Sequence, residues 1–182
     1  MTNQYIIAAV RDSKMLSAAI NSPVSHVFLL CGSICELSEH CSLLRDAGKK
    51  VFLHLDLLEG LRSDHSGIRF IAEQCSPDGV ISTKGQCLKI AKSYGLKTIL
   101  RCFVIDSLVL KTASQQIKQA KPDYIEVLPG ISAKIIRLAL MQFKLPIIAG
   151  GLISEEQDIK NAFEAGATAV STSRPELWNR KQ

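Results

Sequence analysis

Short apolar runs alternate with amphipathic stretches along the whole chain. The apolar runs are rich in Val, Ile and Leu, and the stretches between them have the spacing of helices that bury one face. Eight runs are predicted to be strands, at residues 5–10, 26–31, 50–57, 79–83, 97–104, 123–130, 146–151 and 168–173. Continuous apolar strands separated by helices are typical of a parallel sheet whose outer face is covered.

Eight strand–helix units favour closure of the sheet into a compact (β/α)8 barrel of the TIM type. Seven intervals separate residue 5 from residue 168, about 23 residues each, whereas a barrel of ~250 residues has ~31 per unit. We therefore expect one or two degenerate helices. An open flavodoxin-like sheet is the alternative. The 182 residues contain no linker or low-complexity segment, so residues 1–182 are expected to form one barrel domain.

Capping signals mark several of the expected helix starts. Asp106 or Ser107, and Ser132, stand directly before amphipathic stretches, and such residues favour the N-cap position. The spacing of a capping box occurs at three further places, Ser33 with Glu36, Ser154 with Gln157, and Ser173 with Glu176.

The last two predicted strands end in small residues that can donate hydrogen bonds. Gly150 and Gly151 end one strand, and Ser171, Thr172 and Ser173 end the other. Glycines let backbone amides approach a ligand closely, and hydroxyl groups beside a helix start add donors where the helix dipole is positive. Because the loops after strands seven and eight of such barrels often bind phosphate, these five residues are predicted to form a phosphate site.

Charged residues within buried parallel strands are informative, since such strands are otherwise apolar. Six occur in the second half or at the end of a predicted strand, where barrel ligands bind: Arg11, His54, Asp56, Lys84, Arg101 and Glu126. His54 and Asp56 are two residues apart and therefore share a face. The apolar residues around them, Leu53, Leu55 and Leu57, indicate that the shared face is the barrel lumen.

Two interpretations of these six residues stay open. Arg11 and Arg101 could pair with Asp56 and Glu126 as a purely structural plug, because an unpaired buried charge is very costly. Alternatively, the six residues line a small-molecule pocket beside the phosphate site. The cations then favour an anionic ligand, and the carboxylates accept hydrogen bonds from hydroxyl groups. This second interpretation indicates a small polyol phosphate.

Catalytic and metal-binding roles are less well supported by the sequence. Lys84 could form a Schiff base, but nothing in the sequence indicates a lowered pKa for it. Asp56 and Glu126 could bind a divalent ion or act as acid and base, although the nearby cations favour their neutralisation. The six cysteines lack the paired spacing of a zinc site and read as free thiols. We expect no metal, no cofactor and no catalytic residue.

The net charge of +5 suits an anionic partner, but a basic excess of this size does not identify nucleic-acid binding by itself. The N-terminal residues lack the pattern of a signal peptide. No apolar run reaches the ~18 residues that a membrane-spanning helix needs. A cytoplasmic protein without membrane contact is expected, and homo-oligomerisation is left open.

Several segments, in this order along nearly the whole chain, carry a resemblance to a known family. They are HLDLLEG (54–60), GVISTK (79–84), LRCFVID (100–106), PDYIEVLPGI (122–131), PIIAGG (146–151) and AVSTSRPELW (169–178). Together they resemble the bacterial glycerol-3-phosphate-responsive antiterminators, which regulate glycerol uptake operons. The DYIEVLPG run followed by the GG strand end and the TS-x-x-x-LW tail is the specific part.

The resemblance implies a small TIM barrel that binds glycerol 3-phosphate as its effector. It also implies action on the leader mRNA of glycerol operons to prevent transcription termination. By the resemblance, the phosphate is held by Gly150, Gly151, Ser171, Thr172 and Ser173, and the polyol end is lined by Arg11, Asp56, Lys84, Arg101 and Glu126. Position 84 is lysine where the family motif reads ISTR, which keeps the charge but makes a bidentate grip doubtful.

Three functions are compatible with this reading. The first is a regulator whose ligand occupancy changes its affinity for RNA, with the loop 59–67 and the C-terminal helix as the mobile parts. The second is a phosphosugar lyase, isomerase or synthase, which needs an acid–base pair near the substrate. The third is a metabolite-binding structural subunit. The basic residues are scattered along the sequence and aromatic residues are few, so the residues alone do not predict RNA binding.

Overall fold

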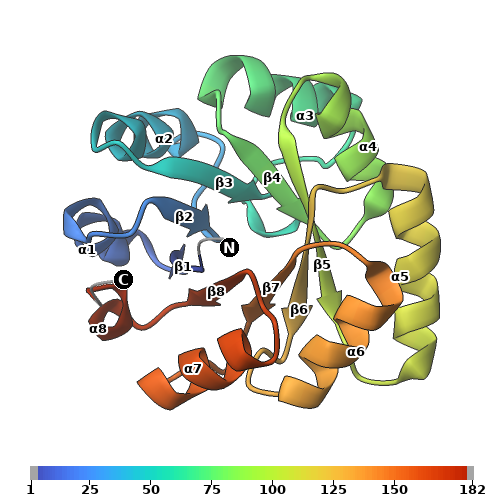
Figure 1. Ribbon diagram of the computed structural model, residues 1–182. Helices are drawn as coiled ribbons and strands as arrows, with labels where there is room; N and C mark the ends of the chain where they lie inside the picture. Colours follow the sequence, from blue (N-terminus) through green and yellow to red (C-terminus); the bar gives the residue numbers. More distant parts are fainter. Residues whose placement is uncertain (1–3, 180–182) are drawn as a thin grey trace.

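The computed structural model describes residues 4–179, and its strands form a closed, all-parallel barrel in sequence order. β8 pairs with β1 and completes the barrel (Figure 1). The prediction of a (β/α)8 barrel is confirmed, and the open sheet is excluded. The strands are β1 Tyr5–Val10, β2 His26–Leu29, β3 Lys50–His54, β4 Gly79–Ser82, β5 Lys97–Phe103, β6 Tyr124–Leu128, β7 Ile147–Gly150 and β8 Ala169–Thr172.

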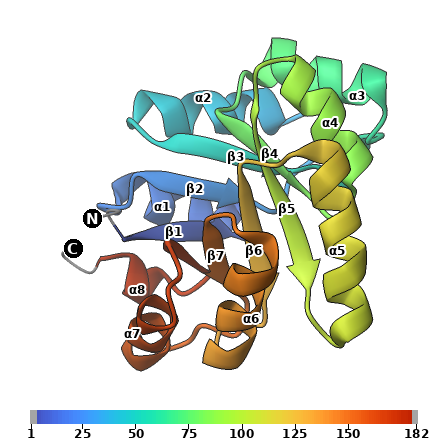
Figure 2. The same ribbon diagram turned by 45° about the vertical axis from the view of Figure 1, so that its right-hand side comes forward.

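Helices cover the outside of the strands, as the two views in Figures 1 and 2 show. They are α1 Leu16–Asn21, α2 Leu37–Asp46, α3 His65–Phe70, α4 Gly85–Ser93, α5 Ser107–Ala120, α6 Ala133–Phe143, α7 Glu156–Glu164 and α8 Pro175–Trp178. The short repeat is accommodated by short helices, because α1 has six residues and α8 has four. α3 also has only six α-helical residues but continues as a π-helical segment, Ile71–Cys75. None of the helices within residues 4–179 is long and apolar enough to cross a membrane.

Side chains alternate along each strand between the lumen and the covering helices. The lumen is filled at mid-height by an apolar layer of Ile7, Phe28, Phe52, Ile81, Ile99, Ile148 and Ala169. A larger apolar cluster lies between the outer face of the strands and the helices. The barrel is therefore a packed core. Arg101 and Ser171 come two residues after Ile99 and Ala169 on their strands, so they lie beyond the apolar layer, toward the carboxyl ends.

The capping predictions are right where one polar residue precedes a helix and wrong for the three boxes. Asp106 accepts hydrogen bonds from the backbone N–H groups of Leu108 and Val109, and Ser132 accepts one from Ile135. Helices α2, α7 and α8 instead have Glu36, Glu155 and Arg174 at the N-cap. α2 begins later than predicted because a turn occupies residues 34–36, whereas α7 and α8 begin one residue later. In α7 the capping box is formed by Glu155 and Asp158 instead.

Gly79, at the start of β4, is required by close packing inside the barrel. A Cβ at this position would lie 2.5 Å from the carbonyl oxygen of Lys97 and 2.6 Å from the ring of Phe52. We expect Gly79→Ala to lower the free energy of unfolding by about 1–3 kcal/mol, the usual cost of overpacking, in urea denaturation. Gly85→Ala is the matched control, because the nearest atom to its new Cβ would be the Cβ of Gln116, at 3.2 Å, and no backbone atom would be as close as at Gly79. Equal losses in the two variants would contradict this account.

Candidate ligand-binding site

A cavity of about 790 Å³ opens at the carboxyl ends of the strands. Nine of the eleven residues predicted for the site line it: Arg11, His54, Asp56, Arg101, Glu126, Gly151, Ser171, Thr172 and Ser173. They come from the ends of β1, β3, β5, β6, β7 and β8, which the closed barrel brings to one place. Gly150 and Lys84 do not line the cavity.

The floor of the cavity is built around the carboxylate of Glu126, which is 1% exposed. Oε2 of Glu126 accepts a hydrogen bond of 2.6 Å from Nε of Arg101, its neighbour across the β5–β6 ladder. Oε1 accepts one of 2.7 Å from the hydroxyl group of Ser171 on β8. This bond passes over β7, which lies between β6 and β8. Both carboxylate oxygens are therefore engaged within the protein.

Gly150 makes that bridge sterically feasible. A Cβ at position 150 would lie 2.5 Å from Oε1 of Glu126 and 2.6 Å from Oγ of Ser171. The sequence predicted that this glycine lets backbone approach a phosphate. The structure shows a different close approach, between two side chains that meet above it.

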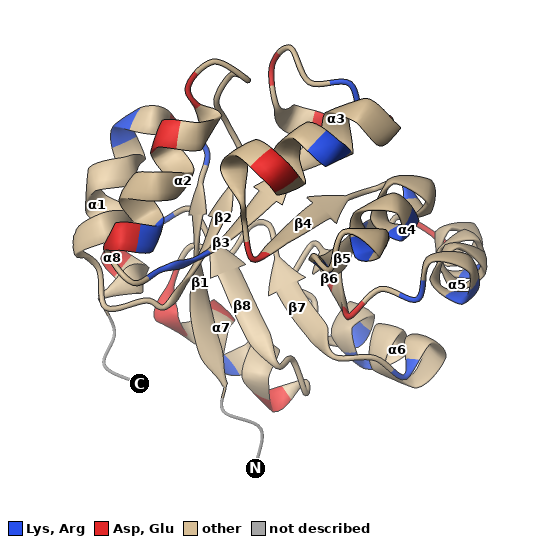
Figure 3. Ribbon diagram, turned by 90° about the horizontal axis from the view of Figure 1, so that it is seen from above, with Lys and Arg blue, Asp and Glu red and all other residues tan. Residues whose placement is uncertain are grey.

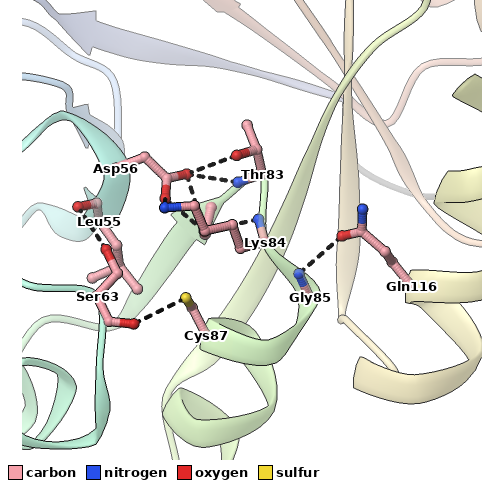
Figure 4. A network of polar contacts seen from close by, with 9 residues as sticks. Leu55, Asp56, Ser63, Thr83, Lys84, Gly85, Cys87 and Gln116 are labelled. Carbon is pink, nitrogen blue, oxygen red and sulfur yellow. Dashed lines mark hydrogen bonds and ion pairs between the residues drawn. The ribbon is translucent and has the colours of Figure 1, made fainter.

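Asp56 lies in a 3-10 turn, Leu55–Leu57, directly after β3. Its carboxylate accepts hydrogen bonds from the hydroxyl group of Ser82 and from both the backbone N–H and the hydroxyl group of Thr83 (Figure 4). Burial opposes ionisation of Asp56, but these hydrogen bonds outweigh it and hold the pKa of the carboxyl group below its usual value. Asp56 is therefore an ionised acceptor whose oxygens already have partners.

Lys84 is the N-cap residue of α4 and does not line the cavity. Its side chain is 64% exposed, and Nζ lies 3.6 Å from Oδ1 of Asp56 (Figure 4). The side chain thus reaches the rim of the site through an exposed ion pair. This position does not suit the Schiff-base role, which needs a lysine inside the pocket.

His54 is the last residue of β3 and only 2% exposed. Burial, with the nearby positive charge of Arg101 as a second cause, lowers the pKa of its imidazole to about 4. The ring is neutral at pH 7, and its Nδ1 atom is buried without a hydrogen-bond partner among residues 4–179. A buried polar atom without a partner costs free energy, and among the described residues that line the cavity Nδ1 of His54 is such an atom.

The predicted phosphate loops have two committed hydroxyl groups, those of Ser171 and Thr172, and a left-handed turn. Thr172 donates its hydroxyl hydrogen to the carbonyl group of Ile153 at 2.9 Å, and its own carbonyl group accepts a bond from the indole of Trp178. These bonds tie the end of β8 to the β7–α7 loop and to α8. Gly151 and Leu152 have φ values of 78° and 61°, which turn the loop away from the direction of β7.

Arg11 follows β1 and is the one cation of the site without a carboxylate partner within the described range, residues 4–179. The structural-plug interpretation required Arg11 to pair with Asp56 or Glu126. Arg101 does pair with Glu126, as that interpretation expected, whereas Asp56 pairs with Lys84. A free guanidinium group therefore remains at the cavity wall.

Exposed apolar side chains form the mouth of the cavity, and sequence reasoning missed them. Leu57, Phe103, Ile105 and Leu152 all line the cavity and are 48–87% exposed. Leu57 was expected to face the helices like Leu53 and Leu55. That prediction is wrong because β3 ends at His54 and the 3-10 turn breaks the alternation of the strand. The usable signal was apolar residues just past each strand end.

Fold and site together define a TIM-type barrel with a cavity at the carboxyl ends of its strands, lined by charged and hydroxyl groups at its floor and by apolar side chains at its mouth. Residues 6–178 match the family model described as glycerol-3-phosphate responsive antiterminator. The chain belongs to this family, as its sequence motifs predicted.

Individual relatives agree with that assignment. The chain is 39% identical over 173 residues to the Escherichia coli K12 protein YgcP, described as uncharacterised, with 95% of this chain and 91% of YgcP covered. A glycerol uptake operon antiterminator regulatory protein from Listeria monocytogenes superposes with a TM-score of 0.94 at 33% identity, covering 100% of this chain and 98% of that one. An antiterminator-related protein from Thermotoga maritima gives 0.84 at 31% identity, with 97% and 99% covered. Solved enzymes at 14–16% identity, such as decarboxylase and aldolase barrels, share the fold alone.

Breaking the Arg101–Glu126 pair should be costly. Arg101→Met leaves the Glu126 carboxylate buried without its charged partner, and we expect the free energy of unfolding to fall by about 3–5 kcal/mol. The double variant Arg101→Met/Glu126→Leu removes both charges and should recover most of that loss. Urea denaturation of the two variants measures the difference. A double variant no more stable than the single one would contradict the pairing argument.

His54 should make the protein sensitive to acid. The folded pKa of about 4 lies below the ordinary value of ~6.5, so between these pH values the unfolded chain binds a proton that the folded chain does not. The folded state has its full stability above pH ~6.5, and this stability falls as the pH is lowered toward ~4. The total loss is about 3 kcal/mol. His54→Gln should flatten this part of the stability profile in urea denaturation. Exposed His65→Gln is the control, and the same flattening there would refute the assignment.

Proposed function

We propose that this protein binds glycerol 3-phosphate in the cavity and, when loaded, acts on the leader mRNA of glycerol operons as a transcription antiterminator. We also propose that the 182 residues act as one barrel domain and that the protein is not an enzyme. The family assignment supports the effector and the regulatory role. The cavity supports the location of the effector, because it joins a free cation to a set of hydrogen-bonding groups.

Arg11 is the observation that carries the effector site. A guanidinium group binds phosphate oxygens well because its planar N–H groups form charge-assisted, often bidentate bonds. Arg11 lines the cavity together with Gly151 and Ser173, whose loops follow β7 and β8. The phosphate of the effector is placed against these groups. Its glycerol hydroxyl groups are then directed across the floor toward Asp56 and His54.

The floor chemistry favours binding over catalysis. The two carboxylates have their oxygens engaged by Arg101, Ser171, Ser82 and Thr83. A general acid or base works best with a pKa near the operating pH, whereas the pKa values of Asp56 and His54 are lowered. Among the described residues, no lysine lines the cavity. This set of groups can hold a polyol phosphate but lacks an evident nucleophile or proton shuttle.

Thermal unfolding with and without ligand tests the site. Glycerol 3-phosphate at 100 times its dissociation constant should stabilise the protein by about 2.7 kcal/mol, while glycerol alone should produce no comparable shift. Arg11→Gln should weaken the affinity about 10- to 100-fold, because a charged hydrogen bond contributes about 1.5–3 kcal/mol. It should leave the unliganded melting temperature unchanged, since Arg11 is exposed and has no ion pair with any of residues 4–179.

Lys14→Gln is the matched control, as Lys14 is exposed near the same strand end but does not line the cavity. An unchanged ligand shift in Arg11→Gln would place the phosphate elsewhere. Conversion of triose or polyol phosphates by the purified protein would contradict the proposal that it is a regulator only.

A further inference from the structure

The positive charge of the chain is concentrated in one sector of the barrel. Residues 79–154 contain eleven Lys and Arg against three Asp and Glu, a net charge of +8. The rest of the chain has eleven basic and fourteen acidic residues, a net charge of −3. Consecutive helices are neighbours in this barrel, and α4 packs against α5 and α5 against α6. The excess therefore appears on one continuous surface.

Helices α4, α5 and α6 contain no acidic residue. Figure 3 shows blue without red on these three helices, whereas α2, α7 and α8 carry red. The basic residues of α4, α5 and α6 are all exposed: Lys89, Lys92, Lys111, Lys118, Lys134 and Arg137. Within residues 4–179 only Lys92 among them has an acidic partner, Asp123 at 3.8 Å. We name these six side chains the basic face.

We infer that the basic face is the surface on which the leader RNA binds, through its phosphate backbone. Exposed cations without acidic partners are suited to a polyanion, since they release counterions when they neutralise phosphates. Lys111 and Lys118 are two helical turns apart, about 10.5 Å along α5, and Lys134 and Arg137 share a face of α6. A row of charges of this length fits an extended polyanion better than a small ligand.

The neutral side chains of the face favour backbone contacts over base stacking. α5 exposes Gln115 and Gln119 between its lysines, and α6 exposes Met141. The one aromatic residue of the three helices, Phe143, is 7% exposed. Recognition of unpaired bases commonly uses exposed aromatic rings, which this face lacks, so phosphate and sugar contacts are the ones it can supply.

The basic face is connected to the effector cavity by two loops. Phe103, Val104 and Ile105 line the cavity and lead into α5, and Leu128 and Pro129 line it and lead into α6. A ligand in the cavity therefore contacts the segments that set the positions of both helix starts. If loaded and empty forms differ there, effector and RNA affinities are coupled, and the coupling must be reciprocal.

This inference rests on the proposed function, and one experiment separates the two. The triple variant Lys111→Gln/Lys118→Gln/Arg137→Gln removes three charges from the basic face. Its matched control, Lys14→Gln/Arg62→Gln/Lys160→Gln, removes three exposed charges outside the basic face. Lys14 lies in a 3-10 turn, Arg62 in a loop and Lys160 in α7. Binding of an in vitro transcript of a glycerol-operon leader is measured by fluorescence anisotropy at several salt concentrations, with glycerol 3-phosphate present.

The triple variant should bind the transcript about 50- to 150-fold more weakly at 0.15 M salt, with a log–log salt slope reduced by about 2–3. The control should bind like the wild type. Both variants should keep the full thermal shift with glycerol 3-phosphate, which shows an intact fold and effector site. Equal weakening in both variants, or none in the triple variant, would overturn the basic face as the RNA surface while leaving the proposed function standing.

Two other outcomes would also overturn the inference. A wild-type protein that binds glycerol 3-phosphate but not the transcript would overturn the antiterminator function itself. Loss of binding to anionic lipid vesicles in the triple variant, with transcript binding unchanged, would assign the basic face to a membrane surface instead of RNA.

Discussion

The carboxylate of Glu126 is the constraint on which the ligand end of this barrel depends. It lies almost fully buried above the apolar layer of the lumen, where an unpaired charge would be very costly. Arg101 and Ser171 must therefore be held against it, and their bonds of 2.6 and 2.7 Å join β5, β6 and β8. β7 must pass beneath the Glu126–Ser171 bond without a side chain at that point, and it has Gly150 there. The cavity floor is thus fixed before any ligand arrives, and its local charge is balanced.

A balanced floor changes what the remaining groups can do. Since Glu126 is matched by Arg101 and Asp56 by Lys84, the positive charge left over at the cavity wall belongs to Arg11. Among the described residues that line the cavity, the buried side-chain atom without a hydrogen-bond partner is Nδ1 of His54. A cation after β1 and hydrogen-bonding groups at the end of β3 suit a molecule with an anionic end and a hydroxylated end. The structural plug and the ligand pocket are therefore not alternatives, because the first builds the floor of the second.

The sequence was sufficient for the barrel and for most of the cavity lining. The apolar runs and helix-like stretches predict the order of the strands. Closure of the barrel then brings the carboxyl ends of all strands to the same side. Polar residues that were chosen only because they stand at strand ends therefore lie close together. Prediction failed where the strand ended earlier than its apolar run. Leu57 and Lys84 lie beyond the last residues of β3 and β4, where alternation no longer determines which way a side chain points. The role of Gly150 depends on the side chains of Glu126 and Ser171, which are distant from it in sequence. No local sequence pattern could therefore have predicted this role.

The basic face illustrates a different limit of sequence reading. Counted over the whole chain, the lysines look scattered and the excess of +5 is modest. In this barrel, however, helices that are consecutive in sequence are also neighbours in space. An excess of positive charge that is confined to consecutive segments therefore lies on one side of the surface. The information was therefore present in the order of charges, but it became interpretable only once the closed topology placed α4, α5 and α6 side by side.

The rigid floor also limits how an effector could influence that sector. A lumen packed with Phe28, Phe52 and five aliphatic side chains offers little room for movement, so a signal must pass through the loops at the mouth. Phe103 and Ile105 are 50% and 87% exposed there. Closing them over a ligand and burying about 100 Å² of apolar surface would contribute about 2.5 kcal/mol. Allosteric couplings typically amount to about 1–3 kcal/mol, so movement of this one loop is energetically sufficient to link the cavity to α5.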